Sequence, residues 1–136
     1  MVKMYRQQKI DLMNMFQKLD SHVALICDTW TSIPCEPFIC ITVHWLNNTW
    51  ILEKRIIAFD IMEERHTGFN IKTRIVNTCR EFNLDDKVFS VSFDNASANT
   101  QAIKGIKNDL SLVLDGVFVH VRCCAHILNL CVQTSK

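Results

Sequence analysis

The stretch that decides the fold runs from Lys87 to Asn99 and reads Lys-Val-Phe-Ser-Val-Ser-Phe-Asp-Asn-Ala-Ser-Ala-Asn. Its first half, Val88 to Phe93, is rich in β-branched and aromatic residues, which is typical of a β-strand. Asp94 stands where this run stops and a helical pattern begins. Ligands of open α/β sheets bind outside the carboxyl ends of the strands, so this carboxylate is well placed for chemistry.

A second apolar run ends in the same way, because Val23 to Cys27 is followed by Asp28. This run shows no polar alternation, which predicts a strand that is covered on both faces and is central in its sheet. If the strand that ends at Phe93 lies beside it in parallel, Asp28 and Asp94 emerge at the same edge. We therefore expect the two aspartates to lie close together, as the ligands of a metal pair do.

Composition and charge restrict the class of protein. The chain has 136 residues, of which 49% are apolar, and this suits one domain with a substantial core. Its net charge of +1 comes from mixed signs, so no basic face announces a nucleic-acid partner. Seven cysteines without a disulfide framework spacing, and no signal peptide, favour a reducing compartment. Apolar runs fall short of the roughly 20 residues of a membrane helix, so we expect a soluble protein.

A leading helix and an antiparallel meander are predicted for the first half. Residues 4–19 carry apolar side chains at helical intervals and predict an amphipathic helix before the first strand. Residues 38–46 and 50–59 are strand-like, and Asn47 and Asn48 between them suit the positive-φ positions of a tight hairpin turn.

The third predicted strand has features of a sheet edge. Glu53, Lys54 and Arg55 interrupt its apolar run, and such charges discourage pairing with a further strand. Trp45 and Trp50 flank the predicted turn, where we expect them to pack across the two strands.

Helices and strands are expected to alternate in the second half. Thr67 is the predicted N-cap of one helix, and Ser97 or Asn95 that of a second helix whose apolar face extends to Val113. A turn, a short strand over 117–121 and a final helix from Ala125 follow. The predicted fold is a mixed five-stranded α/β sheet, with three antiparallel strands first and βα units after them, and with helices on its faces.

Four motifs in this order resemble the catalytic core of hAT-superfamily DNA transposases, most closely the plant RICESLEEPER-like members. They are Asp28-Thr-Trp-Thr-Ser32, His66-Thr-Gly68, Asp94-Asn-Ala-Ser-Ala-Asn99 and Arg122-Cys-Cys-Ala-His-Ile-Leu-Asn-Leu130. The resemblance implies a ribonuclease-H-like fold, with a leading helix over 1–20 and part of the catalytic core over 21–136. It also implies a nuclear protein with DNA, at transposon ends, as its partner.

The resemblance further implies that Asp28 and Asp94 are two of three acidic metal ligands, for Mg²⁺ or Mn²⁺. The third ligand of the family is a glutamate on a later helix that this chain does not reach. Five glutamates of this chain fall in the wrong segments to replace it: Glu36, Glu53, Glu63, Glu64 and Glu81. We therefore expect the C-terminal part of the fold, together with a family region for homo-oligomerisation, to be missing, and the chain to be inactive by itself.

Each singled-out residue also has a structural interpretation. Asp94, at a strand-to-helix junction, is in a position typical of a helix cap. Asp28 could be a loop residue whose carboxylate pairs with a nearby basic side chain. Trp30 could stack on a DNA base or form a wall of the site, but packing in the core is the preferred interpretation. Arg122 suits a phosphate contact or a carboxylate partner, and Asn95 suits support of the site or a helix cap.

Cys123 and His126 form a Cys-x-x-His pair, which is a spacing found in zinc sites. No second pair of suitable spacing accompanies it, so the sequence does not favour zinc. The resemblance places this motif near the active site, where His126 contacts DNA phosphate or stabilises the fold. For Cys123 and Cys124 we expect buried packing at a helix start.

Two functional hypotheses follow. The first is that the chain is part of a hAT transposase core, whose complete family members carry out metal-dependent DNA cleavage and strand transfer. The second is a domesticated DNA-binding or protein-interaction module that keeps the fold without catalysis.

Overall fold

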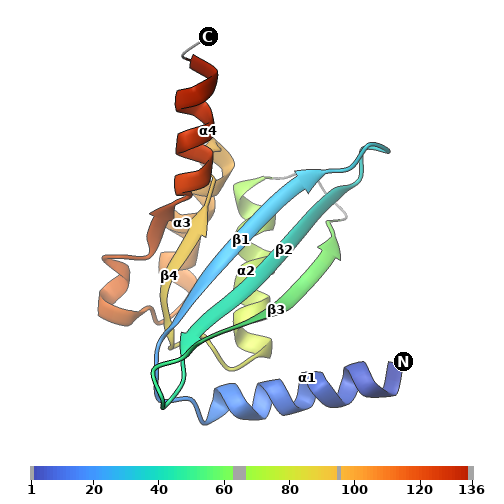
Figure 1. Ribbon diagram of the computed structural model, residues 1–136, viewed down its shortest axis with the longest axis vertical. Coiled ribbons are helices and arrows are strands. Elements are labelled where there is room, and N and C mark those ends of the chain that lie inside the picture. Colours follow the sequence, from blue (N-terminus) through green and yellow to red (C-terminus); the bar gives the residue numbers. More distant parts are fainter. Residues whose placement is uncertain (1, 63–66, 95, 135–136) are drawn as a thin grey trace.

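The computed structural model describes residues 2–62, 67–94 and 96–134, and these form one mixed sheet with helices (Figure 1). The elements in chain order are α1 (Val2–Gln17), β1 (Val23–Thr31), β2 (Pro37–Leu46), β3 (Leu52–Ile61), α2 (Gly68–Glu81), β4 (Val88–Phe93), α3 (Ser97–Asp109), the 3-10 turn η1 (Val113–Gly116), β5 (His120–Arg122) and α4 (Cys124–Thr134). The five strands lie in the order β3-β2-β1-β4-β5. The predicted fold class is confirmed.

Strand pairing has the predicted pattern. β1 pairs antiparallel with β2, and β2 pairs antiparallel with β3, which is an edge strand as its charges indicated. β1 pairs in parallel with β4, and β4 pairs in parallel with β5. β1 is therefore the central strand at which the meander and the βα units join.

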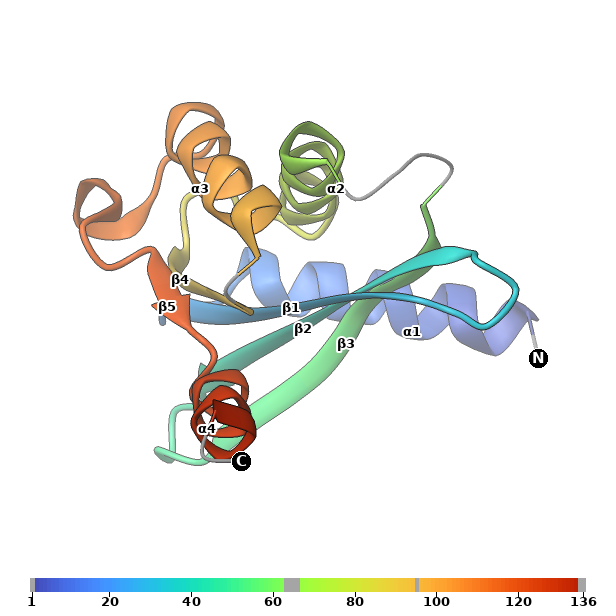
Figure 2. The ribbon, with the colours of Figure 1, turned by 90° about the horizontal axis from the view of Figure 1, so that it is seen from above.

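The prediction that β1 is covered on both faces is wrong. Its alternate side chains Val23, Leu25 and Cys27 are buried, whereas Ile26 on the opposite face is 44% exposed. α2 and α3 both lie on one face of the sheet (Figure 2). We call the opposite face of the sheet, on which Ile26 lies, the open face. Because apolar residues also occupy this face of β1, the strand lacks the alternation of apolar and polar residues that marks a strand covered on one face only.

α1 closes one end of the core. It lies across the end of the sheet (Figure 1), and Phe16 near its C-terminus is completely buried. The Phe16 ring meets Trp45 of β2 edge-on at a centroid distance of 5.2 Å and Phe82 after α2 at 6.3 Å. The predicted leading helix is confirmed, and its last turn packs against both β2 and the residue that follows α2.

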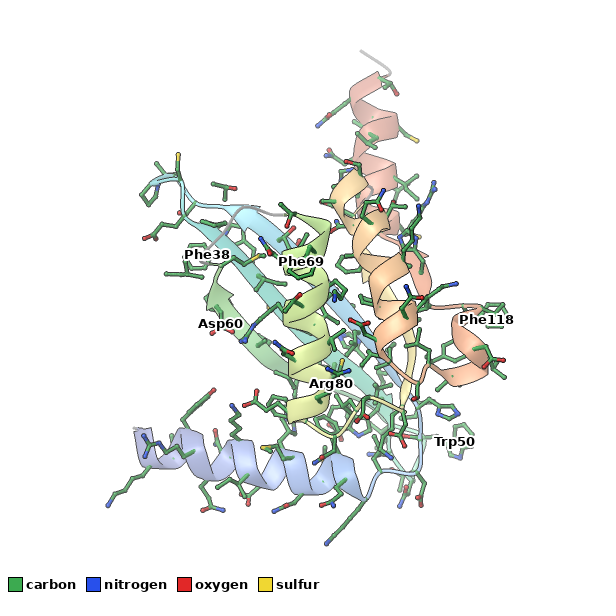
Figure 3. The ribbon with its side chains drawn as sticks, turned by 180° about the vertical axis from the view of Figure 1, so that it is seen from behind. Phe38, Trp50, Asp60, Phe69, Arg80 and Phe118 are labelled. Atoms are coloured by element: carbon green, nitrogen blue, oxygen red, sulfur yellow. The ribbon has the colours of Figure 1, made fainter. Side chains whose placement is uncertain are left out.

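The β2–β3 connection differs from the predicted tight turn. Asn47 Oδ1 accepts hydrogen bonds from the backbone N–H groups of Thr49 and Ile51 at 2.9 and 3.0 Å, which shapes a longer loop. The residue with positive φ is Trp50, at 63°, instead of Asn47 or Asn48. Trp50 is 82% exposed and points away from the sheet (Figure 3), so the prediction that it packs across the strands is also wrong, although Trp45 is buried.

The last elements are shifted relative to the prediction. β5 is three residues long and begins at His120, because η1 has left-handed backbone at Leu114, Asp115 and Gly116 and delays the strand. α4 forms where a helix was expected, yet none of its described residues is buried. Figure 1 shows α4 projecting beyond the sheet. None of the helices in the described part of the chain is long and apolar enough to cross a membrane.

α2 and α3 pack closely because two glycines face the contact. A Cβ on Gly68, at the start of α2, would lie 2.6 Å from Gln101 Cβ and 2.8 Å from the Ala98 carbonyl oxygen of α3. A Cβ on Gly105 would lie 2.8 Å from Lys72 Cγ, which belongs to a flexible side chain. The predicted cap Thr67 fixes this end of α2, since its Oγ1 accepts from Asn70 N at 3.2 Å.

We predict that Gly68→Ala destabilises the protein by about 1–3 kcal/mol, because the added methyl meets the backbone of α3. Urea unfolding followed by circular dichroism measures the change. The control is Gly105→Ala, for which the Lys72 side chain can move and helix propensity improves by about 1 kcal/mol. Equal loss of stability in the two variants would contradict this account.

Candidate functional site

The register of β1 and β4 brings the two predicted aspartates to one edge. Ile26 of β1 lies opposite Ser92 of β4, and Asp28 and Asp94 each follow two residues later. Side chains two residues apart in a strand share a face, so Asp28 lies with Ile26 on the open face. Both aspartates are near enough to Cys27 for their charges to raise the pKa of its thiol.

Asp94 combines a capping role with a free oxygen. Its Oδ1 accepts a hydrogen bond from Ala96 N at 2.9 Å and another from Asn99 Nδ2 at 2.5 Å. Neither Ser97 nor any other side chain within the described residues caps α3 in the usual way, since its N-cap is Ala96. Asp94 therefore stabilises the start of α3 with Oδ1, while its Oδ2 has no hydrogen bond to any of the described residues.

Asp28 is exposed and, within the ranges that the structure describes, its side chain has neither a hydrogen bond nor an ion pair. The interpretation of Asp28 as a loop residue paired with a base is not realised there, because it lies inside β1 opposite Cys40. An unpaired carboxylate on a strand is well solvated and is free to bind a cation.

Cys123 and His126 lie at the same end of the sheet. Cys123 N donates to the Phe93 carbonyl oxygen at 2.7 Å, beside Asp94, and the Cys123 carbonyl oxygen accepts from Ile127 N in the first turn of α4. Both side chains are half-buried, while Arg122 and Cys124 are exposed, so the expected burial of Cys124 is wrong. None of the described residues of α4 is buried, so Cys124 in its first turn is exposed as well.

The described residues hold no group of three or more His, Cys, Asp and Glu side chains arranged for a metal ion. Asn95, singled out by the sequence, lies outside the described residues, as does His66.

The expectation that Trp30 packs in the core is wrong, because Trp30 is 37% exposed and packs against other rings on the open face. Its ring stacks on Phe38 at a centroid distance of 5.4 Å and meets Phe59 at 5.6 Å. These three rings, one from each strand of the meander, form an aromatic cluster two residues along β1 from Asp28. They help to hold the strand that carries the aspartate.

Sequence reasoning missed Asn99, which is only 2% exposed and bonded to Asp94. A signal was present, because Asn99, Ile103 and Ile106 recur at helical spacing on the buried face of α3. A polar residue on that face requires a partner, and the strand end beside it supplies one.

Cys27 was also missed as a neighbour of the site. Burial raises the pKa of its thiol, and the Asp28 charge raises it further. Burial likewise raises the pKa of Cys79, on the buried face of α2, to about 12, with a smaller contribution from Asp85. Both thiols are protonated at neutral pH, so neither offers a thiolate ligand there.

With this geometry in view, comparison with known proteins shows that residues 26–118 match the model of the ZBED1 RNase-like domain. The chain belongs to the ZBED1 RNase-like domain family. The match spans β1 to the turn before β5 and so includes both aspartates of the sheet edge. The expected ribonuclease-H-like fold and the hAT resemblance are confirmed at this level.

Individual relatives support the same family. The chain is 39% identical to a putative AC transposase of Zea mays over 93% of its own length, and 26% identical to the zinc finger BED domain-containing protein RICESLEEPER 1 of Oryza sativa over 95%. It is 27% identical to a putative transcriptional regulator, tpeD, of Talaromyces stipitatus over 86%. The match covers 16%, 19% and 14% of these relatives, so this ZBED1 RNase-like domain corresponds to less than a fifth of each.

We predict that protonation of His120 destabilises the domain. Its Nε2 is buried without a hydrogen-bond partner among the described residues, and burial, followed by the charges of Arg122 and Lys107, lowers its pKa from 6.5. The unfolded chain therefore binds the proton first, so the histidine's contribution to stability is complete above pH 6.5 and is lost as the pH falls through and below that value.

Urea midpoints measured between pH 5 and 8 test this prediction. We expect His120→Leu to reduce the loss of stability on acidification, and His22→Leu, at an exposed position, to leave the profile unchanged. An identical acid loss in wild type and His120→Leu would refute it.

The buried thiols give a further prediction, because the thiolate is the reactive form of cysteine. Iodoacetamide at pH 7.5 should modify the exposed Cys35 and Cys124 in the folded protein and leave Cys27 and Cys79 unmodified until urea is added. Peptide mass mapping measures the modification. Labelling of Cys27 as fast as that of Cys35 would show that its environment is open.

Proposed function

We propose that the chain is part of the catalytic core of a hAT-type DNA transposase, in which Asp28 and Asp94 are two ligands of Mg²⁺ or Mn²⁺. One observation supports this proposal: the parallel β1–β4 register pairs Ile26 with Ser92, and Asp28 and Asp94 each follow two residues later on these neighbouring segments. The hAT relatives, which include a putative transposase, support the assignment. DNA is the proposed partner, and the nucleus is the proposed location.

The donor set fits the proposed ions. Carboxylate oxygens are hard ligands, and Mg²⁺ commonly binds one or two carboxylates while keeping several waters. Asp94 offers Oδ2, since hydrogen bonds hold its Oδ1, and Asp28 is exposed without a partner in the described part of the chain. Asp28 in β1 and Asp94 directly after the neighbouring β4 would thus supply a partial site.

When bound, a divalent ion would stabilise the charge that builds up on the attacking and leaving oxygens of a phosphodiester. The residues of this chain would bind and orient. Asp28 and Asp94 fix the position of the ion, and Arg122, exposed at the end of β5, supplies a positive charge for a DNA phosphate. His126 lies in the first turn of the helix that follows.

By the hAT resemblance a third acidic ligand is needed for turnover. The described residues do not add a third His, Cys, Asp or Glu to the two aspartates. We therefore propose that this chain by itself binds the metal weakly and does not cleave DNA.

The second candidate function is a DNA-binding or protein-interaction module without catalysis. The relative named as a putative transcriptional regulator favours it, because that protein shares 27% identity over most of this chain. The fold and the open face would then be kept, while the aspartates would have lost their metal. The two candidates differ in whether a divalent ion binds at the sheet edge.

We predict that Mn²⁺ and Mg²⁺ produce saturable NMR changes around both aspartates, and that Asp28→Ala and Asp94→Ala each abolish them. The matched control is Asp86→Ala, an exposed carboxylate before the other end of β4, which should leave the titration unchanged. The experiment also measures DNA cleavage, which we expect to be absent.

The outcomes separate the two candidates. No metal response from the folded wild-type protein would overturn the metal site and favour the non-catalytic module. A response that survives both substitutions would place the ion elsewhere on the molecule.

A further inference from the structure

We propose that Asn99 is a positioning residue for Asp94: it fixes the carboxylate so that one oxygen remains directed to a metal ion. This inference rests on the proposed metal-binding role of Asp94. Asn99 lies in the first turn of α3, is 2% exposed, and donates from Nδ2 to Asp94 Oδ1 at 2.5 Å.

The partner of the amide determines its orientation. An ionised carboxylate only accepts hydrogen bonds, so the NH₂ group of Asn99 must face Asp94 and its Oδ1 must face away. That Oδ1 is buried without a hydrogen-bond partner in the described structure. An unpaired buried carbonyl oxygen lowers stability, so packing alone does not favour an asparagine at this position.

Two hydrogen-bond donors fix the orientation of the Asp94 carboxylate more completely than one donor would. The Ala96 N–H, at 2.9 Å, comes from the chain that follows Asp94, and the Asn99 N–H comes from the helix behind it. The backbone donor forms a local turn that leaves the Asp94 side chain some rotation. A second donor on the same oxygen, from a buried and ordered side chain, restricts χ1 and χ2 together.

The restriction matters for a site with few ligands. Groups that hold a metal ligand in place affect its affinity although they do not contact the ion. With two carboxylates at this edge, the entropy lost in ordering Asp94 would be a large part of the binding free energy. Asn99 removes that loss before the ion arrives.

A purely structural role for Asn99 predicts something different. In that case its removal would lower stability and leave the conformation of Asp94 unchanged. In the positioning role, Asn99→Ala eliminates the unpaired oxygen together with the donor, and the conformation of Asp94 changes even where the fold is intact.

The first test needs no metal. Three-bond couplings from Asp94 Cγ to its backbone N and C′ report χ1, and we expect a single rotamer in wild type and averaged values in Asn99→Ala. Asn99→Leu, which has a similar volume and no hydrogen-bond donor, should also release Asp94, so that the test remains available if one of the two variants fails to fold. A single unchanged rotamer in the folded variants would overturn the inference.

The second test is Mn²⁺ affinity, which we expect to fall about 10- to 100-fold in Asn99→Ala. The control is Thr78→Ala, a buried polar residue of α2 whose Oγ1 bonds to Arg74 O. That variant should lose stability and keep its affinity. An equal fall in both variants, or an unchanged affinity in Asn99→Ala, would overturn the inference.

The two tests separate this inference from the proposed function. If wild type binds no Mn²⁺, the metal assignment fails, and the couplings alone decide whether Asn99 orders Asp94. If wild type binds Mn²⁺ and Asn99→Ala binds it equally well, the metal assignment stands and the positioning role fails.

Discussion

The structure depends on the parallel pairing of β1 with β4. This pairing joins the antiparallel meander to the βα units, and it connects segments that are far apart in the sequence. Because β1 and β4 are parallel, Asp28 in the second half of β1 and Asp94 directly after β4 come to the same end of the sheet without any dedicated loop. The position of α3 also depends on this register, because α3 begins shortly after β4 ends. The register therefore determines both where α3 packs and where the two aspartates lie.

Charge and burial are separated across β1. On the covered face Cys27 is surrounded by apolar side chains of the core, and on the open face Asp28 is in contact with water. A strand with this division can carry a carboxylate beside the core at little cost, because the charge is never desolvated. The aromatic cluster of Trp30, Phe38 and Phe59 then stabilises the open face without enclosing the aspartate.

Much of this arrangement was predictable, for identifiable reasons. The two apolar runs that end in aspartate determined the central pair of strands, and the charges of residues 53–55 marked the edge strand. The errors came from side chains whose effect depends on their surroundings. Asn47 bonded to its own loop and lengthened the turn, and the apolar residues of the open face imitated full burial. The role of Asn99 required knowledge of burial, which sequence spacing suggests but does not determine.

α4 gives the two sides of the site different local stabilities. An eleven-residue helix is marginal in water when no face of it is buried, and Leu128 here is 67% exposed. Asp28 lies in β1 and Asp94 directly follows β4, and these strands open only when the sheet does, whereas His126 belongs to a segment that can unwind at small free-energy cost. The site therefore combines two carboxylates held by the sheet with a helix, α4, whose order depends on what binds it. Amide hydrogen exchange would be slow in β1 and β4 and fast in α4.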